Sequence, residues 1–118
     1  MNKYKDLMIW QKSLTLATTI YELTSRFPSD EKYGLIAQMR RCAISIPSNI
    51  AEGGGRNSDR EFSRFLSIGY GSLCELETQL LIALNLNIID SEVSERISKD
   101  IEELQKMIYS LIRKLSIE

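Results

Sequence analysis

The sequence contains no histidine. This absence removes the commonest general base, the usual zinc ligand and every Ser-His or Cys-His arrangement for nucleophilic catalysis. It also excludes a di-iron bundle built on Glu-x-x-His motifs. The P-loop, the Gly-x-Gly-x-x-Gly fingerprint and the Cys-x-x-Cys motif are absent as well, so no nucleotide or redox site is indicated. We therefore expect no catalytic residue, no metal site and no cofactor, and a protein that works by assembly and binding.

Proline, glycine and cysteine are scarce, with two, six and two residues among 118. Most of the chain can therefore form long regular elements. Cys42 and Cys74 lie among apolar residues, which favours two buried free thiols over a disulfide between them. The longest apolar run, 80–84, is far too short to span a bilayer, and the N-terminal stretch lacks the pattern of a signal peptide. These absences predict a cytoplasmic protein without a membrane segment.

The residues that are present have the balance of a globular protein, with 43% hydrophobic and 26% charged residues. A length of 118 residues predicts one domain, residues 1–118. Apolar residues recur at spacings of three and four in four segments, which is typical of amphipathic helices. Short connections between them make sequential helices antiparallel. The expected fold is all-α, an up-down-up-down four-helix bundle.

The first helix is predicted from about Asp6, as its N-cap, to Arg26. Its apolar stripe comprises Trp10, Leu14, Ala17, Tyr21 and either Leu23 or Thr24. The second helix is predicted to begin near Ser29 or Asp30 and to continue through a kink at Pro47. Its stripe comprises Leu35, Met39, Cys42, Ile46 and Ile50. The run 53–55 is expected to end it, with a glycine in the left-handed cap conformation.

The third helix is predicted to open at Ser58, because Ser58-Asp59-Arg60-Glu61 has the form of a capping box. A loop at 87–90 closes it, and the fourth helix begins at Asp90 or Ser91 and continues to the end. The stripe of the third helix comprises Phe62, Phe65, Leu66, Gly69, Leu73, Leu76, Leu80, Ala83 and Leu84. That of the fourth comprises Val93, Ile97, Ile101, Leu104, Ile108, Leu111 and Leu115.

The second and third helices carry more apolar surface than one bundle needs. A second apolar sector on the second helix lies away from its core face, and the third helix is apolar nearly all round at 80–86. Such surface favours self-association, with the alternative that the third helix lies deepest and its outer residues are isolated on the surface. The predicted oligomer interface comprises Ile36, Ile44, Pro47, Ala51, Leu81 and Ile82.

The surroundings of Pro47 are polar. Pro47 has no amide hydrogen, so the carbonyl of Ala43 lacks its usual helical donor. We expect nearby polar side chains or water to compensate, and Glu52 to pair with Arg41 or Arg56. The residues with this structural role are Ser45, Ser48, Asn49 and Glu52.

Several strings of the chain together resemble one known family. The longest is Ser45-Ile46-Pro47-Ser48-Asn49-Ile50-Ala51-Glu52-Gly53, whose motif residues are Ser45, Pro47, Asn49, Glu52 and Gly53. The others are Asp6-Leu7, Trp10-Gln11-Lys12, Tyr33-Gly34-Leu35, Gln38-Met39-Arg40-Arg41, Arg56-Asn57-Ser58, Glu61-Phe62 and Gly71-Ser72-Leu73-Cys74-Glu75-Leu76-Glu77-Thr78-Gln79-Leu80. They cover nearly the whole chain. The chain resembles the bacterial four-helix-bundle family first named for proteins encoded in intervening sequences of 23S rRNA genes, which is similar to the accessory variability determinants of diversity-generating retroelements.

This resemblance implies a four-helix protomer that assembles into a ring-shaped homopentamer. The retroelement relatives bind a reverse transcriptase and nucleic acid through basic surface, so it also implies RNA, DNA or a nucleic-acid-processing protein as a partner. The chain departs from the family pattern at Cys42 and Gly69, where alanine is usual, and at Gly54-Gly55, which lengthen the glycine run.

The charge of the chain departs more strongly from what the resemblance implies. Its formal net charge is -1, unlike that of an avid nucleic-acid binder. Residues 1–64 carry ten Lys or Arg against seven Asp or Glu, whereas residues 65–118 carry five against nine. Arginine suits bidentate phosphate contacts, and ion pairing with nearby glutamates is the alternative use of these side chains. The candidate phosphate-binding residues are Arg41, Arg56, Arg60 and Arg64.

Two functions remain open at this point. The first is an oligomeric scaffold or adaptor whose partners are proteins, including its own copies. The second is an accessory factor that binds RNA or DNA weakly and without sequence specificity.

Overall fold

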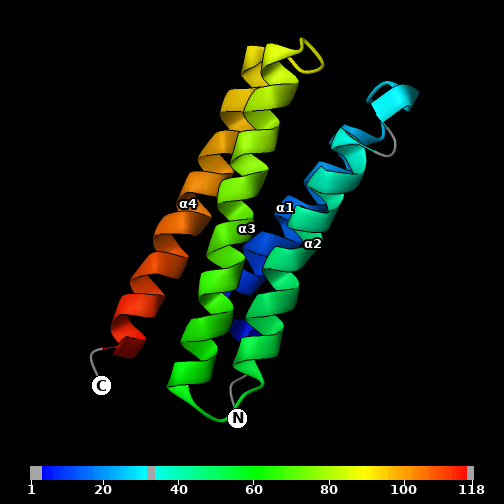
Figure 1. The fold of residues 1–118 in the computed structure, drawn as a ribbon. Coiled ribbons are helices and arrows are strands. Elements are labelled where there is room, and N and C mark those ends of the chain that lie inside the picture. Colours follow the sequence, from blue (N-terminus) through cyan, green and yellow to red (C-terminus); the bar gives the residue numbers. More distant parts are fainter. Residues whose placement is uncertain (1–3, 32–33, 117–118) are drawn as a thin grey trace.

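The computed structural model describes residues 4–31 and 34–116, and Tyr33 of the family pattern lies outside them. Four helices form the molecule: α1 (Met8–Thr24), α2 (Leu35–Gly54), α3 (Asp59–Asn85) and α4 (Ser91–Ser116). Two short 3-10 helices, η1 (Tyr4–Asp6) and η2 (Ser29–Glu31), precede α1 and α2. Each α-helix runs antiparallel to the next (Figure 1), so the predicted up-down-up-down bundle is confirmed.

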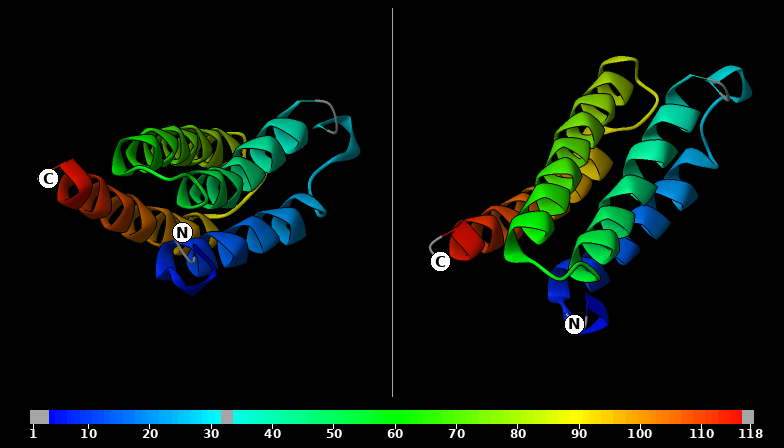
Figure 2. Two further views of the ribbon diagram at one scale, coloured as in Figure 1. Left: turned by 90° about the horizontal axis from the view of Figure 1, so that it is seen from below. Right: turned by 60° about the horizontal axis from the view of Figure 1, so that its bottom comes forward.

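The four helices are arranged in two layers. Seen along the bundle, α2 and α3 lie in one layer and α1 and α4 in the other (Figure 2). α2 packs against both α1 and α3, and α4 packs against α3 and α1. The described part of the molecule measures 46 × 22 × 19 Å. None of its helices combines the length and the apolar character needed to cross a membrane.

The core is built from the predicted stripes of three helices. α2 contributes Met39, Cys42, Ile46 and Ile50, and all four side chains are buried as expected. Leu35, Phe65 and Leu84 are only half-buried, at the margins of the core. The buried apolar side chains of α3 and α4 are Phe62, Leu66, Leu73, Leu76, Leu80, Ala83, Ile97, Ile101, Leu104 and Ile108.

The stripe predicted for α1 is correct only in part. Thr24, one of two alternatives for its end, is buried, and Trp10 and Ala17 are partly buried against the core, but Leu14 and Tyr21 are exposed. The core face of α1 is a neighbouring stripe that includes two hydroxyl side chains, Ser13 and Thr24. Ser13 Oγ donates to Trp10 O at 2.7 Å, and Thr24 Oγ1 donates to Ile20 O at 2.7 Å. Because each hydroxyl bonds to a carbonyl of its own helix, it can be buried without a lost hydrogen bond. The buried residues of α1 are Ile9, Ser13, Leu16, Ile20 and Thr24.

The starts of α3 and α4 agree with the prediction and α2 ends in the glycine run as predicted, but the starts of α1 and α2 differ from it. Ser58 Oγ accepts from Glu61 N at 3.0 Å, and Asp90 Oδ1 accepts from Val93 N at 2.9 Å, as N-caps do. α1 begins at Met8 with Leu7 in the cap position, so Asp6 is not its N-cap. α2 begins at Leu35, five residues or more beyond the predicted start, and the predicted start belongs to η2 instead.

The glycine run does not end α2 through a left-handed cap. The C-cap residue Gly55 has φ -85°, in the right-handed region. Gly53 and Gly54 are instead places of close approach. A Cβ atom at Gly53 would lie 2.7 Å from Phe65 Cβ, and one at Gly54 would lie 2.8 Å from Tyr4 Cβ. The glycines therefore let α3 and η1 pack against the end of α2.

The two cysteines are both free thiols, but only Cys42 is buried; Cys74 is exposed, contrary to expectation. Burial raises the pKa of the Cys42 thiol, and a hydrogen bond of 3.4 Å from Gln79 Nε2 to its sulfur acts in the opposite direction. The raised pKa favours the neutral thiol at neutral pH, which opposes nucleophilic chemistry.

Candidate functional site: an apolar groove between α1 and α2

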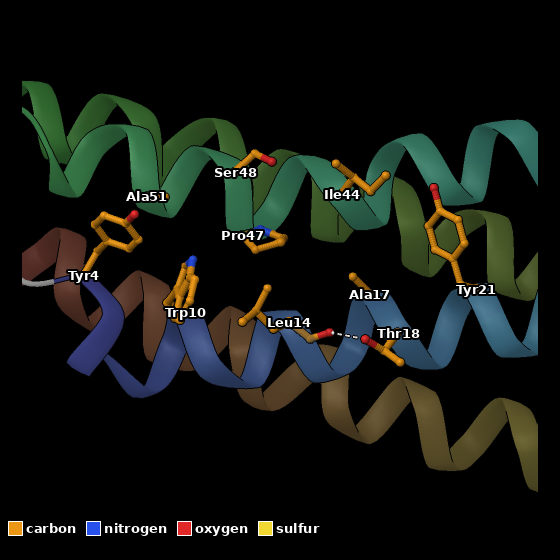
Figure 3. Close-up of a pocket in the computed structure, with 10 residues that line it drawn as sticks. All are labelled: Tyr4, Trp10, Leu14, Ala17, Thr18, Tyr21, Ile44, Pro47, Ser48 and Ala51. Atoms are coloured by element: carbon orange, nitrogen blue, oxygen red, sulfur yellow. Dashed lines mark hydrogen bonds between the residues drawn. The ribbon is translucent and has the colours of Figure 1, made fainter.

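A groove of about 500 Å³ runs along the outer junction of α1 and α2 (Figure 3). One wall comes from α1 and the other from α2, with Tyr4 of η1 at one end. None of its lining side chains carries a formal charge. They are Tyr4, Trp10, Leu14, Ala17, Thr18, Tyr21, Ile44, Pro47, Ser48 and Ala51.

The groove leaves large apolar side chains in contact with solvent. Leu14, Tyr21 and Ile44 are 41%, 39% and 46% exposed. They face a common space although Ile44 is more than twenty residues from Tyr21 in the sequence. A contiguous apolar patch of this kind on a small protein marks an interaction surface more often than isolated exposed residues do.

The two walls explain two features of the sequence. The α1 wall comes from the stripe that periodicity assigned to the core, of which Leu14 and Tyr21 are exposed. The α2 wall is the second apolar sector of the predicted interface, with Ile44, Pro47 and Ala51. The additional apolar stripe of α1 and that of α2 therefore meet at one surface, which is the groove. Sequence reasoning missed the α1 residues of this surface because it had already placed them inside.

Aromatic and cationic contacts hold the ends of the groove in place. Tyr4 packs edge-on against Trp10, with 5.4 Å between ring centroids. At the other end the guanidinium of Arg40 lies 4.5 Å from the centre of the Tyr21 ring. Arg40 Nε donates to Thr24 Oγ1 at 2.8 Å and Arg40 Nη2 donates to Tyr21 O at 3.2 Å. Arg40 thus joins α2 to the last turn of α1, a role that the sequence did not indicate.

Three predicted interface residues lie outside the groove. Ile36 is half-buried and packs against the core. Leu81 and Ile82 are exposed on α3. Because consecutive helical residues point about 100° apart, Leu81 and Ile82 belong to different faces of α3. The predicted set is therefore not one patch, but Ile44, Pro47 and Ala51 form one with the α1 wall.

The family motif forms a polar link between α2 and α3. Ser45 Oγ and Ser72 Oγ are 2.8 Å apart, and Asn49 Nδ2 donates to Ser45 Oγ at 2.9 Å. Asn49 Nδ2 also donates to Ser45 O at 2.8 Å. No side chain of the described residues donates to the carbonyl of Ala43, for which we expected nearby side chains or water to supply a donor. The helix nevertheless continues through Pro47 to Gly54. The motif residues therefore tie two helices together, while Ser48 is exposed at the groove.

The candidate phosphate-binding arginines are mostly engaged within the chain. Arg56 pairs with Glu52 at 2.8 Å, which is one of the two pairings expected for Glu52, and Arg64 pairs with Glu61 at 3.4 Å. Both guanidinium groups also lie over the Phe65 ring, 5.0 and 4.5 Å from its centre. Each exposed pair contributes at most about 1 kcal/mol. Each pair nevertheless places a carboxylate beside its arginine, which reduces the positive potential there.

The other two arginines do not extend this cluster into a basic patch. Arg60 is exposed and lines a shallow hollow with Arg64, but Asp59 and Glu61 line the same hollow. Arg41 is exposed on α2, fifteen residues before Arg56 and therefore about 22 Å away along the helix. The four arginines are thus divided between two places, and three of them are interleaved with acidic side chains.

The model of the 23S rRNA-intervening sequence protein family matches residues 5–110. The chain belongs to this family. A solved structure of a protein of unknown function from the S23 ribosomal protein family of Bacteroides thetaiotaomicron is similar to it, with 27% sequence identity and a TM-score of 0.79. The match covers 89% of this chain and 98% of that protein. A comparison with curated proteins gives no match.

Membership of the family agrees with the resemblance seen in the sequence strings. The matched region contains the Ser45–Gly53 motif and both walls of the groove, apart from Tyr4. The name of the family refers to the position of its genes, so it does not state a molecular activity.

Proposed function

We propose that this chain is a scaffold or adaptor that acts by assembling with copies of itself, and not by catalysis. The observation that carries the proposal is the exposure of Leu14, Tyr21 and Ile44 in one uncharged groove. Covering such a patch removes apolar surface from water, which contributes about 25 cal/mol for each Å². Homo-oligomers with closed symmetry are the common way for a soluble protein to cover it. Five copies is the number that the family resemblance implies.

The substitution Ile44→Glu tests the proposal. Ile44 is 46% exposed in the protomer, so a glutamate there is hydrated and the isolated fold tolerates it. In an assembled interface the same carboxylate is buried without a partner, at a cost of several kcal/mol. We expect sedimentation velocity to show the variant at a much smaller mass than the unmodified protein, while circular dichroism shows the same helix content.

Met8→Glu is the matched control. Met8, the first residue of α1, is likewise large, apolar and exposed, but it lies outside the groove. This variant should keep the mass of the unmodified protein. Equal dissociation of both variants would show that general surface charge, and not the groove, controls assembly. Loss of helix content in Ile44→Glu alone would show that Ile44 belongs to the core.

A further inference from the structure

α3 carries a second uncovered apolar surface, separate from the groove. Ile68 and Ile82 are 43% and 44% exposed, and Leu86 is more exposed still. Their spacing places them on one side of the helix together with Gly71 and Glu75. We call this line of five residues the α3 ridge. It follows the outer side of the junction with α2, because the neighbouring Ser72 and Gln79 bond to Ser45 and Cys42 of α2.

Gly71, in the middle of the ridge, is not required by close packing within the described part of the protomer. A Cβ atom there would meet no described atom within 4 Å, and the residue is exposed. A glycine in a helix interior lowers helix stability relative to alanine by about 1 kcal/mol. Its position between exposed apolar residues suits the close approach of another backbone from outside.

The rims of the two surfaces carry opposite charges. Arg41 lies one helical turn before Ile44 on α2, at the rim of the groove. Glu75 lies one turn after Gly71 on the ridge. Both side chains are exposed, and neither belongs to an ion pair in residues 4–31 and 34–116. Each surface therefore offers an apolar centre with one charge beside it, and within a protomer both charges also act on the pKa of the Cys42 thiol at the α2–α3 junction.

We propose that the α3 ridge of one copy packs into the α1–α2 groove of the next copy, with Gly71 at the closest approach and Glu75 facing Arg41. This inference rests on the proposed function and names the surfaces that carry it. In the same protomer the groove lies at the junction of α1 with α2, whereas the ridge follows the junction of α2 with α3. A contact between two different surfaces is head-to-tail, so each added copy offers a free groove and a free ridge until a ring closes.

Complementation between two variants tests this pairing. Ile44→Glu blocks the groove and leaves the ridge intact, whereas Ile82→Glu blocks the ridge and leaves the groove intact. We expect each variant alone to be a monomer of 13.5 kDa. In an equal mixture, the intact ridge of Ile44→Glu can pack into the intact groove of Ile82→Glu. Native mass spectrometry should then show a heterodimer of about 27 kDa, twice the mass of one chain, and nothing larger.

The outcomes separate this inference from the proposed function. A monomeric unmodified protein would refute both. If the unmodified protein assembles and Ile82→Glu on its own assembles as well, the groove packs against another groove or another surface, and the ridge pairing is wrong. Two monomeric variants that do not combine at the highest soluble concentration would also refute the pairing.

Gly71→Ala supplies a second test that does not add charge. Its matched control is Gly69→Ala in the same helix, where a Cβ atom would meet Ile46 O at 3.8 Å and has room. Both changes should raise the helix stability of the protomer. We expect only Gly71→Ala to weaken assembly, by tenfold or more in the dissociation constant. Equal assembly of the two variants would contradict the close approach over Gly71.

Discussion

Gly53 and Gly55 stand two positions apart in one glycine run but have different surroundings. At Gly53, a Cβ atom would lie 3.0 Å from Phe62 Cδ1 and 3.2 Å from Phe62 O, besides its 2.7 Å approach to Phe65 Cβ. At Gly55, the nearest atom would be Ala51 O at 3.5 Å, an ordinary contact. The sequence predicted that the run ends α2. It could not predict which glycine was sterically required, since Phe62 and Phe65 approach from another helix.

We expect Gly53→Ala to lower the free energy of unfolding by about 1–3 kcal/mol, because overpacking must move a backbone atom of α3. Gly55→Ala is the control and should change it by less than about 0.5 kcal/mol. Urea unfolding measures both. Equal stability of the two variants would show that α3 does not pack as closely on α2 as described.

α1 shows how a helix can fold as predicted and yet face the wrong way in the prediction. It carries two stripes with helical spacing, one with Trp10, Leu14 and Tyr21 and the other with Ile9, Leu16 and Ile20. The second stripe contains the polar residue Ser13, and it also contains Thr24, which the prediction gave as one of two alternatives for the end of the first stripe. Periodicity therefore predicted the four helices, but the orientation of α1 depends on hydroxyl hydrogen bonds that only the folded backbone reveals. The groove was missed for the same reason.

Thr24→Val tests the link between α1 and α2. The Thr24 hydroxyl accepts from Arg40 Nε at 2.8 Å while donating to Ile20 O, and valine removes both bonds without changing the shape of the side chain. We expect a loss of about 1 kcal/mol in the free energy of unfolding. The control is Thr15→Val, because Thr15 is exposed and bonds only to Gln11 O at 3.3 Å. No difference between the two variants in urea unfolding would contradict this role of Arg40.

The whole molecule has little net charge and no concentrated basic surface among its four candidate arginines. We therefore expect binding to unrelated RNAs to be similar in strength, detectable at low salt and largely lost at physiological salt. Arg56→Gln with Arg60→Gln should weaken that binding uniformly and leave the assembly unchanged. Filter binding over a salt series measures the effect. Tight binding to one RNA at physiological salt, unaffected by the double change, would place the nucleic-acid site elsewhere.

At this scale the sequence predicted a surplus of apolar surface but not its distribution. Ile44, Pro47 and Ala51 were recognised as a second face of one helix, and Leu81 and Ile82 as part of another. Which of them share a surface depends on how α1, α2 and α3 pack, and the packing divides them between the groove, the ridge and a third face of α3.

The mass of the unmodified protein in solution tests the account most directly. Light scattering after size-exclusion chromatography, repeated over a range of concentrations, gives this mass without a reference shape. Self-assembly through the groove predicts a particle of several chains, about 68 kDa for five chains of 13.5 kDa each. A single species of 13.5 kDa at micromolar concentration would contradict it, because the groove would then stay exposed in the working protein.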